Sequence, residues 1–136
     1  MLNFQVRPIL ALAAAALLPL VIAGPAQASR ISTPIQSHQV SGTSGGPRQS
    51  SCGFIGEPAL QVQVTEPIAS LRFRVSGGGA PTLYVTNGQI QDCAMSDSLS
   101  GSAIELPGVW EQGTYRVYVG DRDGNAHRYQ LSVTQQ

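Results

Sequence analysis

The chain has 136 residues, and its eight basic and eight acidic residues give a formal net charge of zero. All eight basic residues are arginines, because the sequence contains no lysine. This balance leaves no excess of positive charge for a nucleic-acid partner or for an anionic membrane surface. The length suits one small domain and excludes a large catalytic fold with a deeply buried active site.

Residues 1–28 have the pattern of a secretory signal peptide. Arg7 supplies a positive charge, an apolar run follows over residues 9–23, and Ala26-Gln27-Ala28 is a small-x-small cleavage site. The apolar run is about 15 residues long and contains Pro19, whereas a membrane-crossing helix needs roughly 20 residues. We expect cleavage after residue 28, export to the periplasm, to a lumen or outside the cell, and no stable membrane insertion of the mature chain.

The next segment, residues 29–51, predicts a flexible leader. It contains seven serines, three glycines, two prolines and no acidic residue. Such a composition buries too little apolar surface to offset the entropy cost of ordering the chain. The sequence Gly42-Thr43-Ser44-Gly45-Gly46 matches the Gly-x-Ser-x-Gly motif of hydrolases, but no strand pattern precedes it and the remaining chain is too short for a hydrolase fold. We interpret the motif as part of a linker.

Two cysteines, Cys52 and Cys93, follow the leader. An exported chain meets an oxidising compartment, where an even pair of cysteines usually closes into a disulfide. Metal binding and a nucleophilic thiol are the alternatives, but neither cysteine has a second cysteine or a histidine at metal-ligand spacing. The sequence therefore predicts a structural disulfide.

From residue 52 onward, apolar and polar residues alternate with a period of two, which is typical of half-buried strands. No segment has a helical repeat, and turn-forming pairs such as Asn87-Gly88, Pro107-Gly108 and Asp123-Gly124 separate the runs. This spacing predicts an all-β fold. The expected domain is a small, jelly-roll-like antiparallel β-sandwich of about seven strands over residues 52–136. The clearest alternating runs are residues 60–64, 71–75, 83–86, 104–106, 114–119 and 128–133.

The last two runs predict a closing hairpin. To keep every apolar side chain inward, Val119 must pair with Tyr129 and Val117 with Leu131, which requires a three-residue loop at residues 123–125. The loop residues Asp123, Gly124 and Asn125 are suited to such a turn.

The predicted register directs several arginines and tyrosines outward. Arg116, Tyr118 and Arg128 would lie together on the solvent side of the hairpin. Guanidinium forks beside a tyrosine ring can recognise carboxylates, sugars or extended peptides, so we predict these three as ligand-binding residues. An ordinary solvated sheet surface is the alternative. Arg72, Arg74 and Tyr84 have the same outward parity.

The predicted hairpin loop also carries oxygen donors. Asp121, Asp123 and Asn125 alternate along it, and calcium is bound by such clustered oxygens. Three donors with Arg122 among them cannot assemble a tight site. We therefore predict at most weak calcium binding there, no other cofactor, and ordinary turn chemistry as the alternative.

Several features from Ser70 to Val133 occur together: an apolar strand, a glycine-rich turn, a Thr-Leu-Tyr-Val strand at residues 82–85, and Gly-Thr-Tyr-x-Val-x-Val at residues 113–119 followed by Tyr-x-Leu-x-Val. This stretch resembles the bacterial pre-peptidase C-terminal domain family. The resemblance implies a small β-sandwich with a non-catalytic accessory or binding role. Acidic residues that often precede the Leu-Tyr strand in that family are replaced here by Gly79-Ala80-Pro81, so the resemblance brings no calcium ligands to these positions.

Together these patterns predict an exported, non-catalytic β-sandwich that binds a glycan, a peptide or a protein. One alternative is a purely structural component of an envelope or matrix, stapled by its disulfide. Another is an uncharacterised hydrolase, for which the sequence shows no evident general base.

Overall fold

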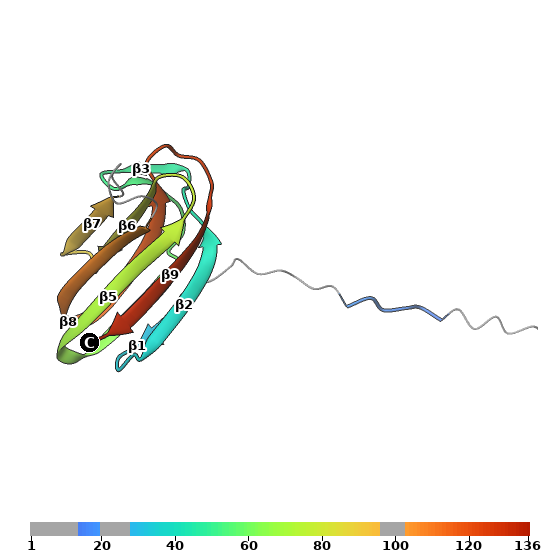
Figure 1. The fold of residues 1–136 in the computed structure, drawn as a ribbon. Coiled ribbons are helices and arrows are strands. Elements are labelled where there is room, and N and C mark those ends of the chain that lie inside the picture. Colours follow the sequence, from blue (N-terminus) through green and yellow to red (C-terminus); the bar gives the residue numbers. More distant parts are fainter. Residues whose placement is uncertain (1–13, 20–27, 96–102) are drawn as a thin grey trace, which may run out of the picture.

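The computed structural model describes residues 14–19, 28–95 and 103–136, which include a two-layered β-sandwich (Figure 1). Most of the predicted signal peptide, residues 1–13 and 20–27, lies outside the described residues, so its cleavage stays a prediction. In the described part of the chain, no helix is long and apolar enough to span a membrane.

The described fold is all-β, as the alternating pattern predicts. Its strands are β1 (Ser29–Ser32), β2 (Ser37–Thr43), β3 (Arg48–Ser50), β4 (Gly53–Ile55), β5 (Leu60–Gly77), β6 (Pro81–Thr86), β7 (Gln91–Met95), β8 (Ala103–Asp121) and β9 (Arg128–Gln135).

The long strands β5 and β8 run through both layers of the sandwich. They pair antiparallel along nearly their whole length, with a register shift between Val64 and Ile68. Glu66 and Pro67, a pair typical of a turn, lie at this shift. They do not end the strand, because a β-bulge tolerates a proline and only bends the strand. Pro107 and Gly108 likewise lie inside β8. The sequence therefore predicted four short strands where the structure has two long, bent ones.

The halves of β5 and β8 belong to different layers. In the first layer β2 pairs with β9, β9 with the second half of β5, and that half with the first half of β8. In the second layer the order is β1, the first half of β5, the second half of β8, β6 and β7, and the β3–β4 hairpin joins the end of β8. The described pairs are antiparallel except that β1 pairs parallel with β5.

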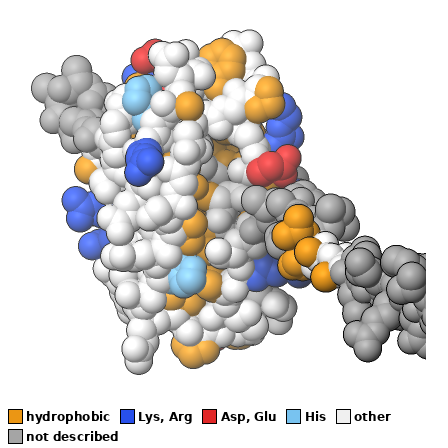
Figure 2. Space-filling model, turned by 90° about the vertical axis from the view of Figure 1, so that its right-hand side faces the viewer, with side chains coloured by type: hydrophobic (Ala, Val, Ile, Leu, Met, Phe, Trp, Pro, Cys, Tyr) orange, Lys and Arg blue, Asp and Glu red, His pale blue; other side chains and the backbone are white. Residues whose placement is uncertain are grey.

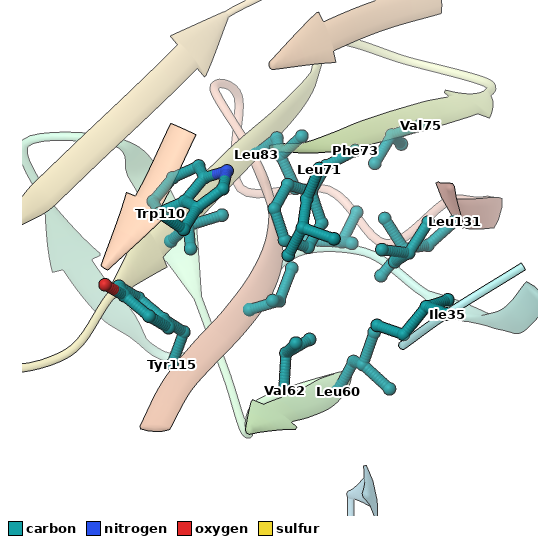
Figure 3. Close-up of a cluster of buried hydrophobic side chains, with 14 of the residues drawn as sticks. Ile35, Leu60, Val62, Leu71, Phe73, Val75, Leu83, Trp110, Tyr115 and Leu131 are labelled. Atoms are coloured by element: carbon teal, nitrogen blue, oxygen red, sulfur yellow. The ribbon is translucent and has the colours of Figure 1, made fainter. Parts of the chain in front are cut away.

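The hydrophobic core lies between the two layers (Figure 3). Phe73 and Trp110 pack edge to face with ring centres 5.5 Å apart, and Trp110 and Tyr115 do so at 5.2 Å. The Tyr115 hydroxyl donates a hydrogen bond of 2.9 Å to the carbonyl of Glu111, and burial raises the pKa of that hydroxyl. The inward positions predicted from the alternation are confirmed: they include Leu60, Val62, Val64, Leu71, Phe73, Val75, Leu83, Val85, Tyr115, Val117, Leu131 and Val133.

The predicted closing hairpin is wrong, although its inward residues are correct. Val119 pairs with Leu83 of β6, whereas Tyr129 pairs with Gly42 of β2 and with Gly77 of β5. The segment after Asp121 therefore crosses from one layer to the other. The alternation of apolar and polar residues fixes which side chains of β9 face the core. It does not decide whether β9 pairs with β8 or with strands of the opposite layer.

The predicted flexible leader is also wrong for residues 29–50. This segment contains β1, β2 and β3, so the described domain begins well before residue 52. Ile35 is 7% exposed and belongs to the core, and Ile31 and Val40 pack against it. A few apolar anchors are enough here because strands added to the edges of an existing sheet obtain their hydrogen bonds from it.

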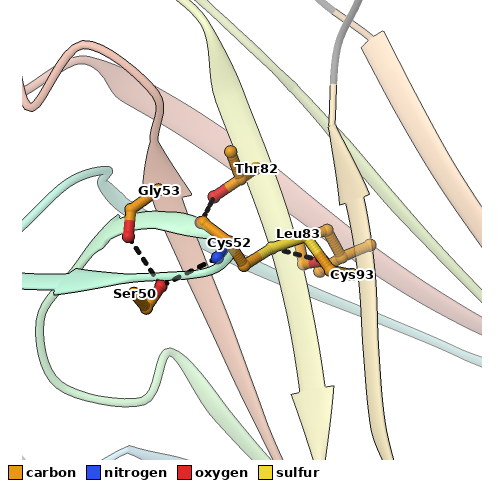
Figure 4. The surroundings of a disulfide bond; sticks show 6 residues. All are labelled: Ser50, Cys52, Gly53, Thr82, Leu83 and Cys93. Atoms are coloured by element: carbon orange, nitrogen blue, oxygen red, sulfur yellow. Dashed lines mark hydrogen bonds between the residues drawn. A yellow bond between two sulfur atoms is a disulfide. The ribbon is translucent and has the colours of Figure 1, made fainter.

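The predicted disulfide between Cys52 and Cys93 is confirmed, with Cα atoms 5.8 Å apart (Figure 4). Cys52 is fully buried, and its carbonyl accepts a hydrogen bond of 2.6 Å from the Thr82 hydroxyl. The Ser50 hydroxyl accepts from the Cys52 N–H at 3.0 Å and donates to the Gly53 carbonyl at 2.6 Å. The bridge therefore fastens the turn between β3 and β4 to β7, across β6.

Candidate binding face

Tyr118, one of the three predicted ligand-binding residues, points away from the core but is covered. It is 7% exposed. Its ring lies 5.6 Å from that of Tyr84, and the Arg48 guanidinium from the β3–β4 hairpin lies 5.9 Å from its ring centre. This aromatic and cation–π packing holds the hairpin against the sheet, so Tyr118 has a structural role.

The two predicted arginine partners are exposed but do not share a surface with each other. Arg116 pairs with Gln61, near the start of β5. Arg128 precedes Tyr129, which pairs with Gly77 at the end of β5. The single Arg116–Tyr118–Arg128 surface predicted from the sequence is therefore wrong, because it depended on the incorrect hairpin.

Asp121, the first predicted calcium ligand, is turned into the protein. It is fully buried, and its carboxylate accepts hydrogen bonds from the N–H groups of Asp123 at 2.8 Å and Ala80 at 3.3 Å. The His127 Nδ1 lies 3.1 Å from its second oxygen. Asp123 and Asn125 are exposed, and no cluster of three or more metal-binding His, Cys, Asp or Glu side chains occurs among the described residues. Weak calcium binding stays a prediction. The Asp121 carboxylate already has hydrogen-bond donors of the protein at its oxygens.

Ser44, in the Gly-x-Ser-x-Gly motif, lies beside the same histidine. Its hydroxyl accepts a hydrogen bond of 3.3 Å from the His127 main-chain N–H, and its own N–H donates to the His127 carbonyl at 2.7 Å. The Ser44 residue is 3% exposed. These contacts join the end of β2 to the start of β9. In both of them the partner of Ser44 is the main chain of His127 and not its ring.

The best candidate for binding is the outer surface of the first layer, where β2, β9 and β5 lie side by side (Figure 1). One row across these strands joins Gln39, Ser132 and Arg74 and continues to Glu105 of β8. Directly opposed residues in a sheet point to the same face and successive rows alternate between the two faces, so every second row is outward as well. We call this surface the polar face; it consists of Ser37, Gln39, Ser41, Thr43, Arg72, Arg74, Ser76, Glu105, Arg128, Gln130, Ser132 and Thr134.

A shallow hollow lies within the polar face. Its volume is about 180 Å³, and its walls come from Gln39, Arg74, Ser76, Gln130 and Ser132. The two short serines leave space between longer side chains, and the Gln130 amide donates a hydrogen bond of 3.0 Å to the Gln39 side-chain carbonyl beside it. Enclosed ligand pockets are larger, roughly 300–1,000 Å³, so this hollow suits contact along one side of an extended ligand.

The charge of the polar face is positive. It carries Arg72, Arg74 and Arg128, three of the chain's eight arginines, and Glu105 is its one acidic residue. The Arg74 Nε lies 3.8 Å from the Glu105 carboxylate, and both side chains are about half exposed. Arg72 Nε is buried, and no hydrogen-bond partner for it is found in the described structure.

Sequence reasoning found only part of this face. The outward parity of Arg72, Arg74 and Arg128 was visible, but Gln39 and Ser41 lie in the predicted leader. The signal that could have revealed them is the short alternation of His38, Val40 and Gly42 with polar residues.

A curated protein of similar length resembles this chain along most of its sequence. It is an uncharacterized protein of Synechococcus elongatus, 39% identical over 128 residues, which cover 90% of this chain and 92% of the relative. The chain belongs to the same family as this cyanobacterial protein. No model of a known protein family matches the sequence.

Solved structures identify the fold. The pre-peptidase C-terminal domain of a collagenase from Bacillus anthracis is similar, with a TM-score of 0.57 and 20% sequence identity over 82% of this chain and 98% of that domain. PliG from Aeromonas hydrophila, a periplasmic inhibitor of g-type lysozyme, has a TM-score of 0.43 and 16% identity over 81% of this chain and 98% of its own. The predicted resemblance to pre-peptidase C-terminal domains is therefore confirmed at the level of the fold.

Proposed function

We propose that this protein is an exported, non-catalytic binding module and that its ligand lies across the polar face. The disulfide supports export, since such bonds persist in oxidising compartments. The observation that carries the proposal is the composition of the polar face, in which hydroxyl, amide and guanidinium groups from three adjacent strands surround a shallow hollow.

An acidic glycan is the ligand class that fits this face best. Exposed Arg74 and Arg128 provide charge-assisted hydrogen bonds to carboxylates. Serine hydroxyls and glutamine amides both donate and accept, which matches the hydroxyl groups of a sugar chain. Neighbouring strands lie about 4.8 Å apart, so the surface offers these groups at regular intervals to an extended polymer.

A non-catalytic role is supported by the geometry around Ser44. Its hydroxyl is buried and bonded to the His127 main chain, whereas a catalytic serine needs an exposed hydroxyl held by the ring of a base. The His127 ring itself is engaged with buried Asp121.

Binding of oligogalacturonate, a chain of sugar carboxylates, to the exported protein tests the proposal by titration calorimetry. We expect binding to this polymer and none to a neutral dextran oligomer. Replacing Arg74 and Arg128 together with alanine should weaken binding at least about tenfold, since each charge-assisted hydrogen bond contributes about 1.5–3 kcal/mol. The matched control is Arg116→Ala, an exposed arginine on the other layer, which should bind like the parent.

All three proteins should unfold at nearly the same temperature, because exposed charges contribute about 0–1 kcal/mol to stability. Equal binding by the double variant and the parent would contradict the proposed face. A parent that binds neither polymer would contradict the ligand class.

A further inference from the structure

Strand β2 has an open edge. It pairs with β9 through seven consecutive residue pairs and with no other strand in the described structure. A groove of about 420 Å³ lies where the end of β2 pairs with the start of β9, lined by Ser41, Gly42, Thr43, Arg128 and Tyr129. The side of β2 opposite β9 is therefore free to pair with another strand.

The other described edges carry features that hinder pairing with another chain. Charged residues and prolines on an edge strand prevent such pairing. The edge strand β1 contains Arg30, β3 contains Arg48, β7 contains Asp92, and the first half of β8 contains Glu105 and Pro107. In contrast, β2 reads Ser-His-Gln-Val-Ser-Gly-Thr, with no Asp, Glu, Lys, Arg or Pro and no bulge in its register.

The main-chain groups at the open edge can be identified. Ser44 N–H donates to His127 O in line with the β2–β9 ladder, and bonded and non-bonded pairs alternate along an antiparallel ladder. The even-numbered residues of β2, such as Val40, therefore bond to β9. The odd-numbered residues Ser37, Gln39, Ser41 and Thr43 direct their N–H and C=O groups to the open side.

We infer that β2 is a dimerisation strand, which pairs antiparallel with β2 of a second copy about a two-fold axis at Val40. Several antiparallel registers place odd-numbered residues of one copy opposite odd-numbered residues of the other. Among them, the register centred on Val40 is the one in which all seven residues of β2 are paired. Gln39 of one copy then exchanges hydrogen bonds with Ser41 of the other, and Ser37 does so with Thr43. The two copies of Val40 form a non-hydrogen-bonded pair at the centre.

The side chains of β2 are self-complementary in this register. On the inner face the two Val40 side chains meet, and each His38 lies opposite a Gly42, so a large residue faces one without a side chain. On the outer face all opposed residues are uncharged, so no like charges meet. This self-complementarity under a two-fold axis favours a second copy over an unrelated peptide.

Partly exposed apolar groups at this edge give the dimer a reason to form. Val40 of β2 and Tyr129 of the neighbouring β9 are only partly buried against the core. Figure 2 shows the side of the molecule where β2 lies, and hydrophobic side chains are visible there as a vertical stripe between polar ones. Pairing would remove part of this apolar surface from water and would join the two polar faces across β2.

Cysteine cross-linking tests the register directly. In the full exported protein, Val40→Cys should form a disulfide-linked dimer under mild oxidation, because Cα atoms of a non-hydrogen-bonded pair lie about 4.5 Å apart. The matched control is Ser41→Cys. Its two copies would be diagonal neighbours, with Cα atoms beyond the roughly 7 Å that a disulfide can bridge, so it should stay monomeric on a non-reducing gel. Cross-linking through position 41 instead of 40, or through neither, would overturn the inference.

A proline at the edge provides a second test. Ser41→Pro removes an N–H that faces the open side and spares the bonds to β9, so it should fold but raise the dimer dissociation constant at least tenfold in sedimentation equilibrium. Ser41→Ala keeps the N–H and should dimerise like the parent. A parent that stays monomeric throughout the concentration series would overturn the inference. If Ser41→Pro does not fold, the cysteine variants decide the question.

Discussion

The disulfide is expected to provide a large share of the domain's stability, because it anchors a hairpin that has few other connections. The β3–β4 hairpin pairs with β8 at a single position, Phe54 with Asp121. Replacing Cys52 and Cys93 with serine removes a bridge between residues 41 positions apart in the sequence. The chain-entropy model gives about 4 kcal/mol for a loop of that length, which is an upper value. For a domain of this size, a loss of that magnitude lowers the unfolding midpoint by roughly 15–30 °C.

Urea denaturation of the parent, with and without reductant, and of the double serine variant measures this loss. The reduced parent and the variant should lose the same free energy of unfolding. Hydrogen exchange should show the earliest loss of protection in β3, β4 and β7, the strands that the bridge connects. Equal stability of the parent with and without reductant would refute the reasoning, and so would an unchanged exchange pattern in these strands.

Two further predictions concern the segment around β2 and the loop after β8. Ile35→Ala should lower the free energy of unfolding by about 2–5 kcal/mol in urea denaturation, because Ile35 is a core residue. The control is Gln36→Ala, a change at an exposed position. A loss below about 0.5 kcal/mol for Ile35→Ala would show that the segment before β3 adds no stability. Calcium should leave the thermal unfolding midpoint almost unchanged, because the Asp121 carboxylate already accepts three hydrogen bonds; a large rise that a chelator reverses would establish a tight site.

Alternation along the sequence was sufficient to predict which residues form the core. Val62, Val117 and Leu131 are all fully buried, as their parity requires. Strand partners could not be obtained in this way, because β9 keeps the same inward residues whether it pairs with β8 or with β5. The pairs Glu66-Pro67 and Pro107-Gly108 were interpreted as turns between strands, but they lie inside β5 and β8. A long strand that bends between layers needs, at its bend, residues that also form turns.

The candidate site was harder to predict than the core, because it depends on strand order. Arg74 and Ser132 are 58 positions apart, and they become neighbours only because β9 pairs with β5. Gln39 completes the row from a segment whose composition indicates disorder. Composition describes what a segment can bury by itself, and β2 is ordered because β9 supplies its main-chain partners.

The polar face and the open edge follow from the same property of β2. A strand of mostly small, uncharged residues gives the first layer an outer surface in which short serines leave room between glutamine and arginine side chains. The same lack of charge leaves the edge unprotected against a second copy. If both proposals hold, the dimer presents two hollows on one continuous surface. An extended acidic polymer that reaches both would bind more tightly than a short one, because its second contact is intramolecular. Long oligogalacturonates should therefore exceed short ones in affinity for the parent, and this advantage should disappear in a monomeric variant.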